Sequence, residues 1–141
     1  MSWDVVIVDS GGKTADCPIT DLDDSDFNPL GPGDEVRNRL SSHLPGIDWS
    51  DPAWGIFEGD GFSIEFNVGE DDPIQSIMLH VRGGGDAISA IMSFVRPLRW
   101  SALDCSTGEF LDPNNPSQEG WEGFQAYRDK ILKKGQKPER D

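Results

Sequence analysis

Ser63, Glu65 and His80 are the side chains whose types could form a hydrolytic triad. They lie on two alternating segments, 62–68 and 77–82, and pairing the apolar faces of these segments places Ser63 opposite His80. Glu65 is then diagonal to His80, at about 7–8 Å between Cα atoms. A serine nucleophile usually sits at a strained turn beside backbone donors for an oxyanion, whereas these positions lie in mid-strand. We therefore expect the polar side of a half-exposed sheet, and we predict no catalytic residue and no enzymatic activity.

A run of carboxylates, Asp21, Asp23, Asp24 and Asp26, is similar to the start of a calcium-binding loop. An EF-hand beginning at Asp21 needs Gly at its sixth position and Glu at its twelfth, where this chain has Asp26 and Pro32. Weak calcium binding by this loop stays an open alternative. A solvated acidic loop, or one that meets a basic partner, fits these residues better.

Gly83–Gly85, between an expected strand and an expected helix, could form an anion-binding nest with Arg82. The spacing matches neither a Walker loop nor a dinucleotide-binding fingerprint. Asp86 at the N-cap of the helix competes for the same donors. We therefore interpret the three glycines as a flexible turn.

The two cysteines, Cys17 and Cys105, are compatible with one disulfide or with two free thiols, and a cytoplasmic location favours the thiols. The chain has no Cys-x-x-Cys motif and no pair of histidines at ligand spacing, which argues against a structural zinc site. We predict neither a metal nor a cofactor.

The hydropathy pattern predicts the elements that must position these residues. Strands are expected at 3–8, 54–58, 62–68, 77–82 and 100–104, with a short returning segment at 109–111. Helices are expected from the N-caps Asp34, Asp86 and Ser117, the first two ending at Pro45 and Pro97. The second, third and fourth strands form an antiparallel meander. Strands with one apolar face favour helices on that face alone, so we predict an α+β fold with an antiparallel sheet of about five strands and about three helices.

The length of 141 residues suits one domain. We assign it to residues 1–134, and we expect residues 135–141 to be a frayed basic tail because Gly135 and Pro138 stop the last helix. No stretch approaches eighteen consecutive apolar residues, and segment 1–9 is acidic where a signal peptide is basic. We expect a cytoplasmic protein without membrane contact.

Negative charge dominates the composition, with 26 Asp and Glu against 12 Lys and Arg. The formal net charge is −14, and residues 1–127 alone carry −17 because half of the basic residues lie in the last fourteen positions. Eight carboxylates and no Lys or Arg lie between Arg39 and Arg82. Such a protein repels nucleic acid and anionic lipid and attracts a cationic partner, although the same charge could serve solubility alone.

Three acidic segments are therefore the candidate surface for a basic protein partner. Trp49 lies between two of these carboxylates in an expected loop, where an exposed aromatic ring would be a binding hot spot. The candidate partner-binding residues are Asp21, Asp23, Asp24, Asp26, Asp48, Trp49, Asp51, Glu70, Asp71 and Asp72. The pattern leaves the oligomeric state and the partner open.

Four segments, Trp49–Gly55, Phe62–Phe66, Ile77–Asp86 and Leu103–Glu109, resemble parts of small uncharacterised bacterial cytoplasmic proteins. In size, acidity and α+β layout the chain is also similar to immunity proteins of bacterial toxin systems. This second resemblance implies a protein that blocks the active site of a co-produced, often basic toxin, and it assigns no site residue.

We therefore expect a binding protein that neutralises a basic partner, as an immunity protein neutralises its cognate toxin. One alternative is a small hydrolase or metal-assisted enzyme that uses His80 and nearby carboxylates. Another is a ligand-sensing or scaffold domain whose acidity serves only solubility.

Overall fold

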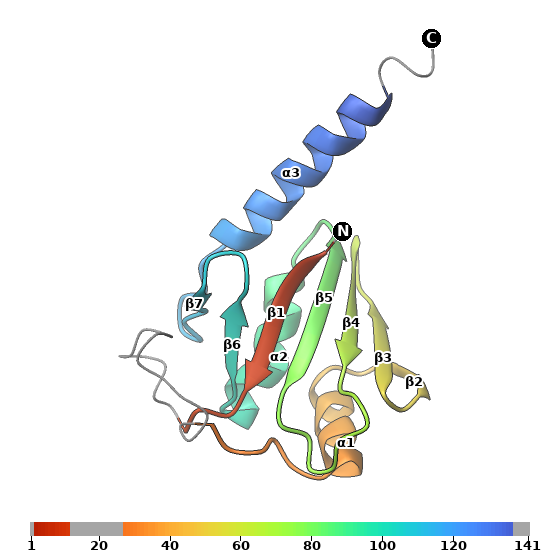
Figure 1. The fold of residues 1–141 in the computed structure, drawn as a ribbon, viewed down its shortest axis with the longest axis vertical. Coiled ribbons are helices and arrows are strands. Elements are labelled where there is room, and N and C mark those ends of the chain that lie inside the picture. Colours follow the sequence, from red (N-terminus) through yellow and green to blue (C-terminus); the bar gives the residue numbers. More distant parts are fainter. Residues whose placement is uncertain (1, 12–26, 137–141) are drawn as a thin grey trace.

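The computed structural model describes residues 2–11 and 27–136, and these form one antiparallel sheet with three helices (Figure 1). The strands are β1 (Trp3–Val8), β2 (Asp48–Asp51), β3 (Trp54–Glu58), β4 (Phe62–Asn67), β5 (Ile77–Gly83), β6 (Ser101–Asp104) and β7 (Glu109–Phe110). The helices are α1 (Gly33–His43), α2 (Ala87–Leu98) and α3 (Glu119–Gln136). The predicted α+β class is confirmed, and the sheet has seven strands where about five were expected.

The sheet order is β2-β3-β4-β5-β1-β6-β7. The first strand of the chain therefore lies inside the sheet, where β1 pairs with β5 on one side and β6 on the other. The predicted meander is present as β3, β4 and β5. Two strands lie at the edges of the sheet: β7 falls in the returning segment expected at 109–111, whereas β2 was not predicted because only one of its four residues is apolar.

The register predicted for the meander is wrong by two residues. Ser63 lies opposite Arg82, and Glu65 lies directly opposite His80. The cause is the connection between the strands, because residues 68–76 leave the sheet: Val68 donates to the carbonyl of Ala53, and Ile74 pairs with Gly31. A shift of two residues keeps every side chain on the same face, so the alternation of apolar residues could not reveal it.

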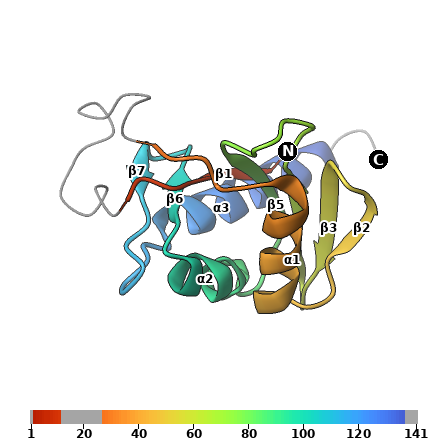
Figure 2. The ribbon, with the colours of Figure 1, turned by 90° about the horizontal axis from the view of Figure 1, so that it is seen from below.

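Helices α1 and α2 lie side by side on one face of the sheet, as the one-sided apolar pattern predicted (Figure 2). Between these layers lies the core, in which β1 alternates strictly between buried and half-exposed positions. Among the described helices, none covers the opposite face (Figure 2). Half-exposed side chains therefore line that face along β1, β4 and β5.

Two of the predicted helix ends need correction. Asp34 is not the N-cap of α1, because the helix begins at Gly33 after Pro32 and Asp34 pairs with Arg37 in the first turns. Asp86 does cap α2, since its carboxylate accepts from the backbone N–H of Ser89 at 3.1 Å. Pro97 does not end α2 but lies in its last turn, where it removes a single helical hydrogen bond.

Helix α3 is attached to the sheet by its first turns only. The indole of Trp121 is buried, with its ring centroid 5.4 Å from that of Trp3, and its Nε1 donates to the carbonyl of Gly85 at 2.9 Å. Most of the helix then projects beyond the sheet (Figure 1), and Tyr127 is 56% exposed. The helix continues past Gly135, where it was expected to stop, and ends at Gln136.

Candidate functional site

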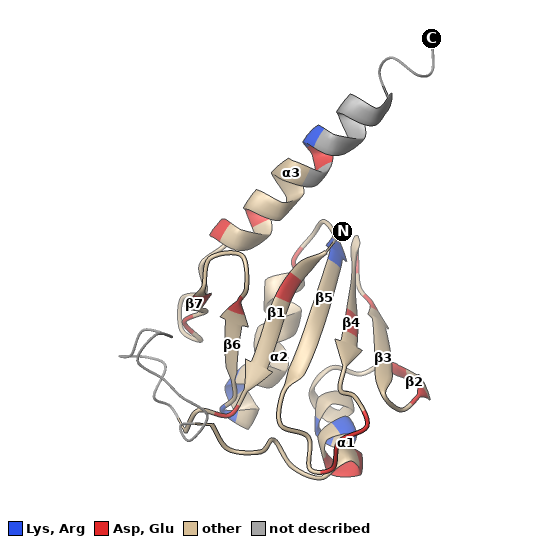
Figure 3. Cartoon of the chain, in the orientation of Figure 1, with Lys and Arg blue, Asp and Glu red and all other residues tan. Residues whose placement is uncertain are grey.

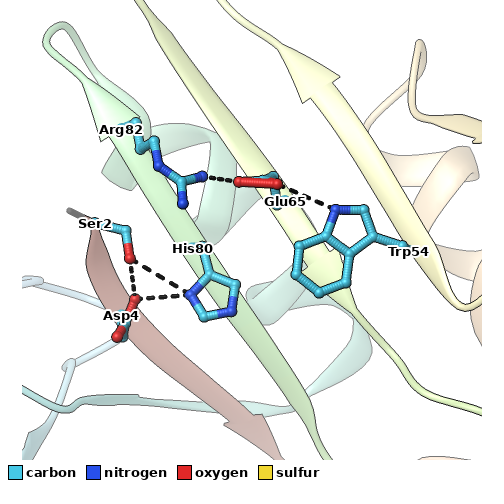
Figure 4. Close-up of polar contacts among 6 residues, drawn as sticks. All are labelled: Ser2, Asp4, Trp54, Glu65, His80 and Arg82. Carbon is cyan, nitrogen blue, oxygen red and sulfur yellow. Dashed lines mark hydrogen bonds and ion pairs between the residues drawn. The ribbon is translucent and has the colours of Figure 1, made fainter.

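A cluster of polar side chains lies on the uncovered face of the sheet. Asp4, His80 and Glu65 are cross-strand neighbours on β1, β5 and β4. The Nδ1 atom of His80 lies 2.9 Å from Oδ1 of Asp4 and 3.4 Å from the hydroxyl of Ser2, which itself donates to Oδ1 of Asp4 at 2.5 Å. Figure 4 shows these side chains pointing out from the sheet.

On the other side of His80 an aromatic ring completes the cluster. The rings of Trp54 and His80 stack with centroids 5.7 Å apart and an interplanar angle of 22°. The indole Nε1 of Trp54 donates to Oε2 of Glu65 at 3.1 Å, and Arg82 forms an ion pair with the same carboxylate (Figure 4). The carboxylates of this face are therefore engaged with His80, Arg82 and Trp54.

The expected neighbours of His80 are thus replaced by others. Ser63 faces Arg82, and the hydroxyl near His80 belongs to Ser2. In a nucleophilic triad the carboxylate holds one ring nitrogen and the hydroxyl contacts the other, whereas here Ser2 and Asp4 both contact Nδ1. The contacts hold the imidazole in place and do not form a proton relay to Ser2.

A group of carboxylates lies at a different part of the molecule, where β2, the 68–76 connection and the start of α1 meet. Asp51, Glu70, Asp71 and Asp72 surround a hollow of about 220 Å³. Figure 3 shows acidic residues on β2, on the connection and on α1. Together with Asp48 at the other end of β2, these residues are called the acidic surface below.

Local hydrogen bonds position several of the acidic surface's carboxylates. Oδ1 of Asp72 accepts from the backbone N–H of Gly33 at 3.3 Å, at the positive end of α1. Oδ1 of Asp51 accepts from the N–H of Ala53 at 3.0 Å. The side chains of Glu70 and Asp71 are exposed and form no hydrogen bond or ion pair with any other described residue. Glu70 and Asp71 are therefore the members best placed to be changed without loss of a structural contact.

Asp48 has a pKa below its ordinary value because the carboxylate is stabilised by Ser50. The hydroxyl of Ser50 donates to Oδ1 of Asp48 at 2.6 Å, and the backbone N–H of Ser50 donates to it at 2.8 Å. Hydrogen bonds to the ionised form favour it, so Asp48 keeps its negative charge to lower pH than a free aspartate.

A single arginine lies among these carboxylates. Arg37 lines the same hollow, bonds to Oδ1 of Asp34 at 2.5 Å and donates to the carbonyl of Pro52 at 3.2 Å. Across the described residues, no ion pair joins any of the five carboxylates of the acidic surface to a cation. The acidic surface therefore keeps a net negative charge beside Arg37.

The expectation that Trp49 is an exposed loop residue is wrong. It lies on the edge strand β2, and its half-buried ring packs over Gly55, with a centroid 6.2 Å from that of Phe66. Its Nε1 donates to the hydroxyl of Ser41 at 2.9 Å. The indole is therefore occupied by the protein itself, and β2 is attached to the core through it.

The remaining predicted site residues, Asp21, Asp23, Asp24 and Asp26, lie outside the described residues, as does Cys17. Cys105 is a free and exposed thiol. Its pKa is raised by loss of hydration and then by the negative charges of Asp4 and Asp104.

The predicted glycine turn packs against the β3–β4 hairpin. The N–H of Gly84 donates to the carbonyl of Gly61 at 2.7 Å, and a Cβ on Gly83 would lie 2.4 Å from the same oxygen. The backbone N–H of Ser89, in the first turn of α2, donates to the carboxylate of Asp86. These donors are engaged within the protein, in agreement with a turn.

Sequence reasoning missed Ser2, Trp54 and Arg37 as neighbours of the candidate residues. The sequence places Trp54 in an expected strand, but its stacking on His80 depends on the position of β3 beside β4. The proximity of Ser2 depends on the placement of β1 beside β5, which no local pattern specifies.

Within residues 2–11 and 27–136, no group of three or more His, Cys, Asp or Glu side chains could hold a metal ion. None of the described helices is long and apolar enough to cross a membrane. In comparisons with protein-family models, curated proteins and solved structures, none matches this chain.

Proposed function

We propose that this protein binds and neutralises a basic protein partner through the acidic surface, in the way that an immunity protein blocks its cognate toxin. The observation that carries the proposal is a group of exposed carboxylates that β2 and the 68–76 connection bring together without paired cations in the described residues. Carboxylates so placed are available to Lys and Arg of another protein.

Electrostatics would act first on the rate of association. A net charge of −14 attracts a cationic protein over a distance of about 8–10 Å in physiological salt, and exposed carboxylates then orient it. Because most of the surface charges stay partly hydrated, each pair contributes only about 0.2–1 kcal/mol to affinity. Fast, salt-sensitive binding is therefore the signature of this function.

The first experiment is to co-purify the protein with the product of the neighbouring gene and to measure association rates at rising ionic strength. The test variant is Glu70→Lys/Asp71→Lys, which reverses two exposed charges of the acidic surface. The control is Glu109→Lys/Glu122→Lys, which changes the net charge equally on β7 and α3. We expect the first variant to slow association about tenfold or more and the control to slow it much less.

Equal effects of the two variants would show that only net charge matters, and the acidic surface would lose its role. Association that does not depend on salt would contradict the proposal as a whole. Thermal unfolding of both variants checks that the substitutions leave the fold intact.

The alternative function is a small hydrolase or metal-assisted enzyme that uses His80 and nearby carboxylates, and the observation that favours it is that Asp4 and Glu65 lie beside His80 on the uncovered face of the sheet. A panel of ester, phosphoester and glycoside substrates would be assayed with the parent protein and with His80→Ala. An activity that disappears in His80→Ala would replace the binding proposal, and a parent without activity would remove the support for an enzyme.

A further inference from the structure

A second hollow lies at the opposite edge of the sheet from β2. It has a volume of about 470 Å³ and is bounded by the end of α2, the start of β6 and segment 110–114. Sites for small organic ligands commonly measure about 300–1,000 Å³. The size of this hollow is therefore sufficient for such a ligand.

Apolar side chains form much of its wall. Val95, Trp100 and Leu111 are 1%, 4% and 5% exposed, and the half-buried ring of Phe110 lies beside them. Val95, Trp100 and Leu111 are packed in the interior and hold the wall in place, and the half-buried ring of Phe110 is the apolar surface that a ligand reaches without rearrangement.

Two arginines, Arg96 and Arg99, line the same hollow. Nε of Arg96 donates to the carbonyl of Pro113 at 2.5 Å, which fixes this guanidinium against segment 110–114. Neither arginine forms an ion pair within the described part of the chain, and the nearby carboxylate of Asp112 accepts from the N–H of Asn114 at 2.9 Å. Two arginines without a carboxylate partner are unexpected in a chain of net charge −14.

Arg99 also has an unfavourable backbone conformation. It is the non-glycine residue with positive φ in the described segments, at φ 58° and ψ 34°, and it follows the last residue of α2. Gly or Asn ordinarily occupies this left-handed position, because a larger side chain is strained there. Residues in such conformations cluster at active sites and ligand-binding sites, which directs attention to the guanidinium.

We propose that this hollow, called the α2 pocket, binds a small organic anion with an apolar body. Its carboxylate lies between Arg96 and Arg99, each of which offers several N–H donors, and its apolar part packs on the ring of Phe110. The inference does not depend on the proposed function, because the α2 pocket and the acidic surface share no residue.

The probe is 1-naphthoate, with 1-naphthalenemethanol as its uncharged analogue, and binding to the full chain is measured by calorimetry and tryptophan fluorescence. Arg99→Asn removes the guanidinium at a position that Asn tolerates, so the variant remains folded. Arg39→Asn on α1 is the matched control, because it changes the net charge equally and lies outside the α2 pocket. Arg99→Gly is a second variant that relieves the backbone strain.

We expect 1-naphthoate to bind the parent and Arg39→Asn alike and to bind Arg99→Asn about tenfold or more weakly, since one charge-assisted contact is lost. Arg99→Gly should lose binding while its urea unfolding midpoint rises, which separates the role of the side chain from that of the backbone. Failure of 1-naphthoate to bind the parent overturns the proposal. Equal binding of the alcohol, or equal weakening by Arg39→Asn, overturns it as well.

Discussion

Gly120→Ala is expected to destabilise the protein, whereas Gly123→Ala, in the same helix, is expected to stabilise it. A Cβ on Gly120 would lie 1.8 Å from Oδ2 of Asp104 and 2.8 Å from the hydroxyl of Ser106. A Cβ on Gly123 would have no neighbour within 4 Å. The two substitutions are chemically identical, so their difference measures the close contact between α3 and the end of β6.

Asp104 cannot easily move away from an added methyl group. It is only 2% exposed, and its Oδ1 accepts from Nε1 of Trp3 at 3.0 Å. The same oxygen accepts from the N–H and the hydroxyl of Ser106 at 2.8 Å and 2.6 Å. Relief of the contact would therefore require either loss of these hydrogen bonds or displacement of the start of α3.

The magnitude follows from two opposing effects. Replacing Gly by Ala in a helix gains up to about 1 kcal/mol, which is the whole effect expected at Gly123. Overpacking at Gly120 costs about 1–3 kcal/mol, and because the gain in helix propensity is common to both substitutions, the two variants should differ by about 1–3 kcal/mol. If α3 detaches instead, the burial of Trp121 is lost, which sets a ceiling of about 5 kcal/mol for about 200 Å² of apolar area.

Urea unfolding followed by tryptophan fluorescence measures the free energies, and Trp3 and Trp121 lie at the contact itself. Asp104→Ala completes a double-mutant cycle, because without the carboxylate the Gly120→Ala substitution should cost little. If Gly120→Ala proves as stable as Gly123→Ala, the described docking of α3 on β6 is refuted.

Two further predictions concern titrating groups. In a Cys17→Ser background, Asp4→Asn should shift the pH dependence of iodoacetamide labelling of Cys105 to lower pH, because one of the negative charges that raise the pKa of this thiol is removed. Mass spectrometry follows the labelling, and an unchanged pH midpoint would show that the charge of Asp4 does not raise this pKa. Ser50→Ala should raise the pKa of Asp48 toward its ordinary value, which an NMR titration of the Asp48 carboxyl detects. A carboxyl group whose pKa is lowered in the folded protein adds stability above its ordinary pKa, and this stability is lost as the pH falls through the folded-state pKa. The difference in unfolding free energy between Ser50→Ala and the parent should therefore shrink in acid. A difference independent of pH would show that the hydrogen bond from Ser50 does not lower the pKa of Asp48.

Much of the fold could be predicted because its signals are local. The alternation in β4 and β5 depends on a period of two, and both strands bury the expected residues. Helix α2 combines a capping Asp86 with a buried apolar stripe, and both were readable from its own twelve residues and the one before them. The one-sided layer arrangement followed from the same alternation.

The candidate site was less accessible to sequence reasoning. The absence of Lys and Arg between Arg39 and Arg82 was plain, but the hollow that joins Asp51 to Glu70–Asp72 depends on where β2 and the 68–76 connection lie. Trp49 was misjudged because a single aromatic residue among polar ones has no period that distinguishes a loop from an edge strand.

By itself, then, the sequence determined the α+β class, the meander, the capped second helix and the excess of negative charge, since each depends on residue types and short spacings. Only the tertiary structure decided that β1 lies inside the sheet, that Glu65 rather than Ser63 faces His80, and that Arg96 and Arg99 share a pocket with Trp100. The physical reason is that a shift of two residues, or an exchange of neighbouring strands, leaves every local apolar pattern unchanged, so long-range packing alone selects among the arrangements.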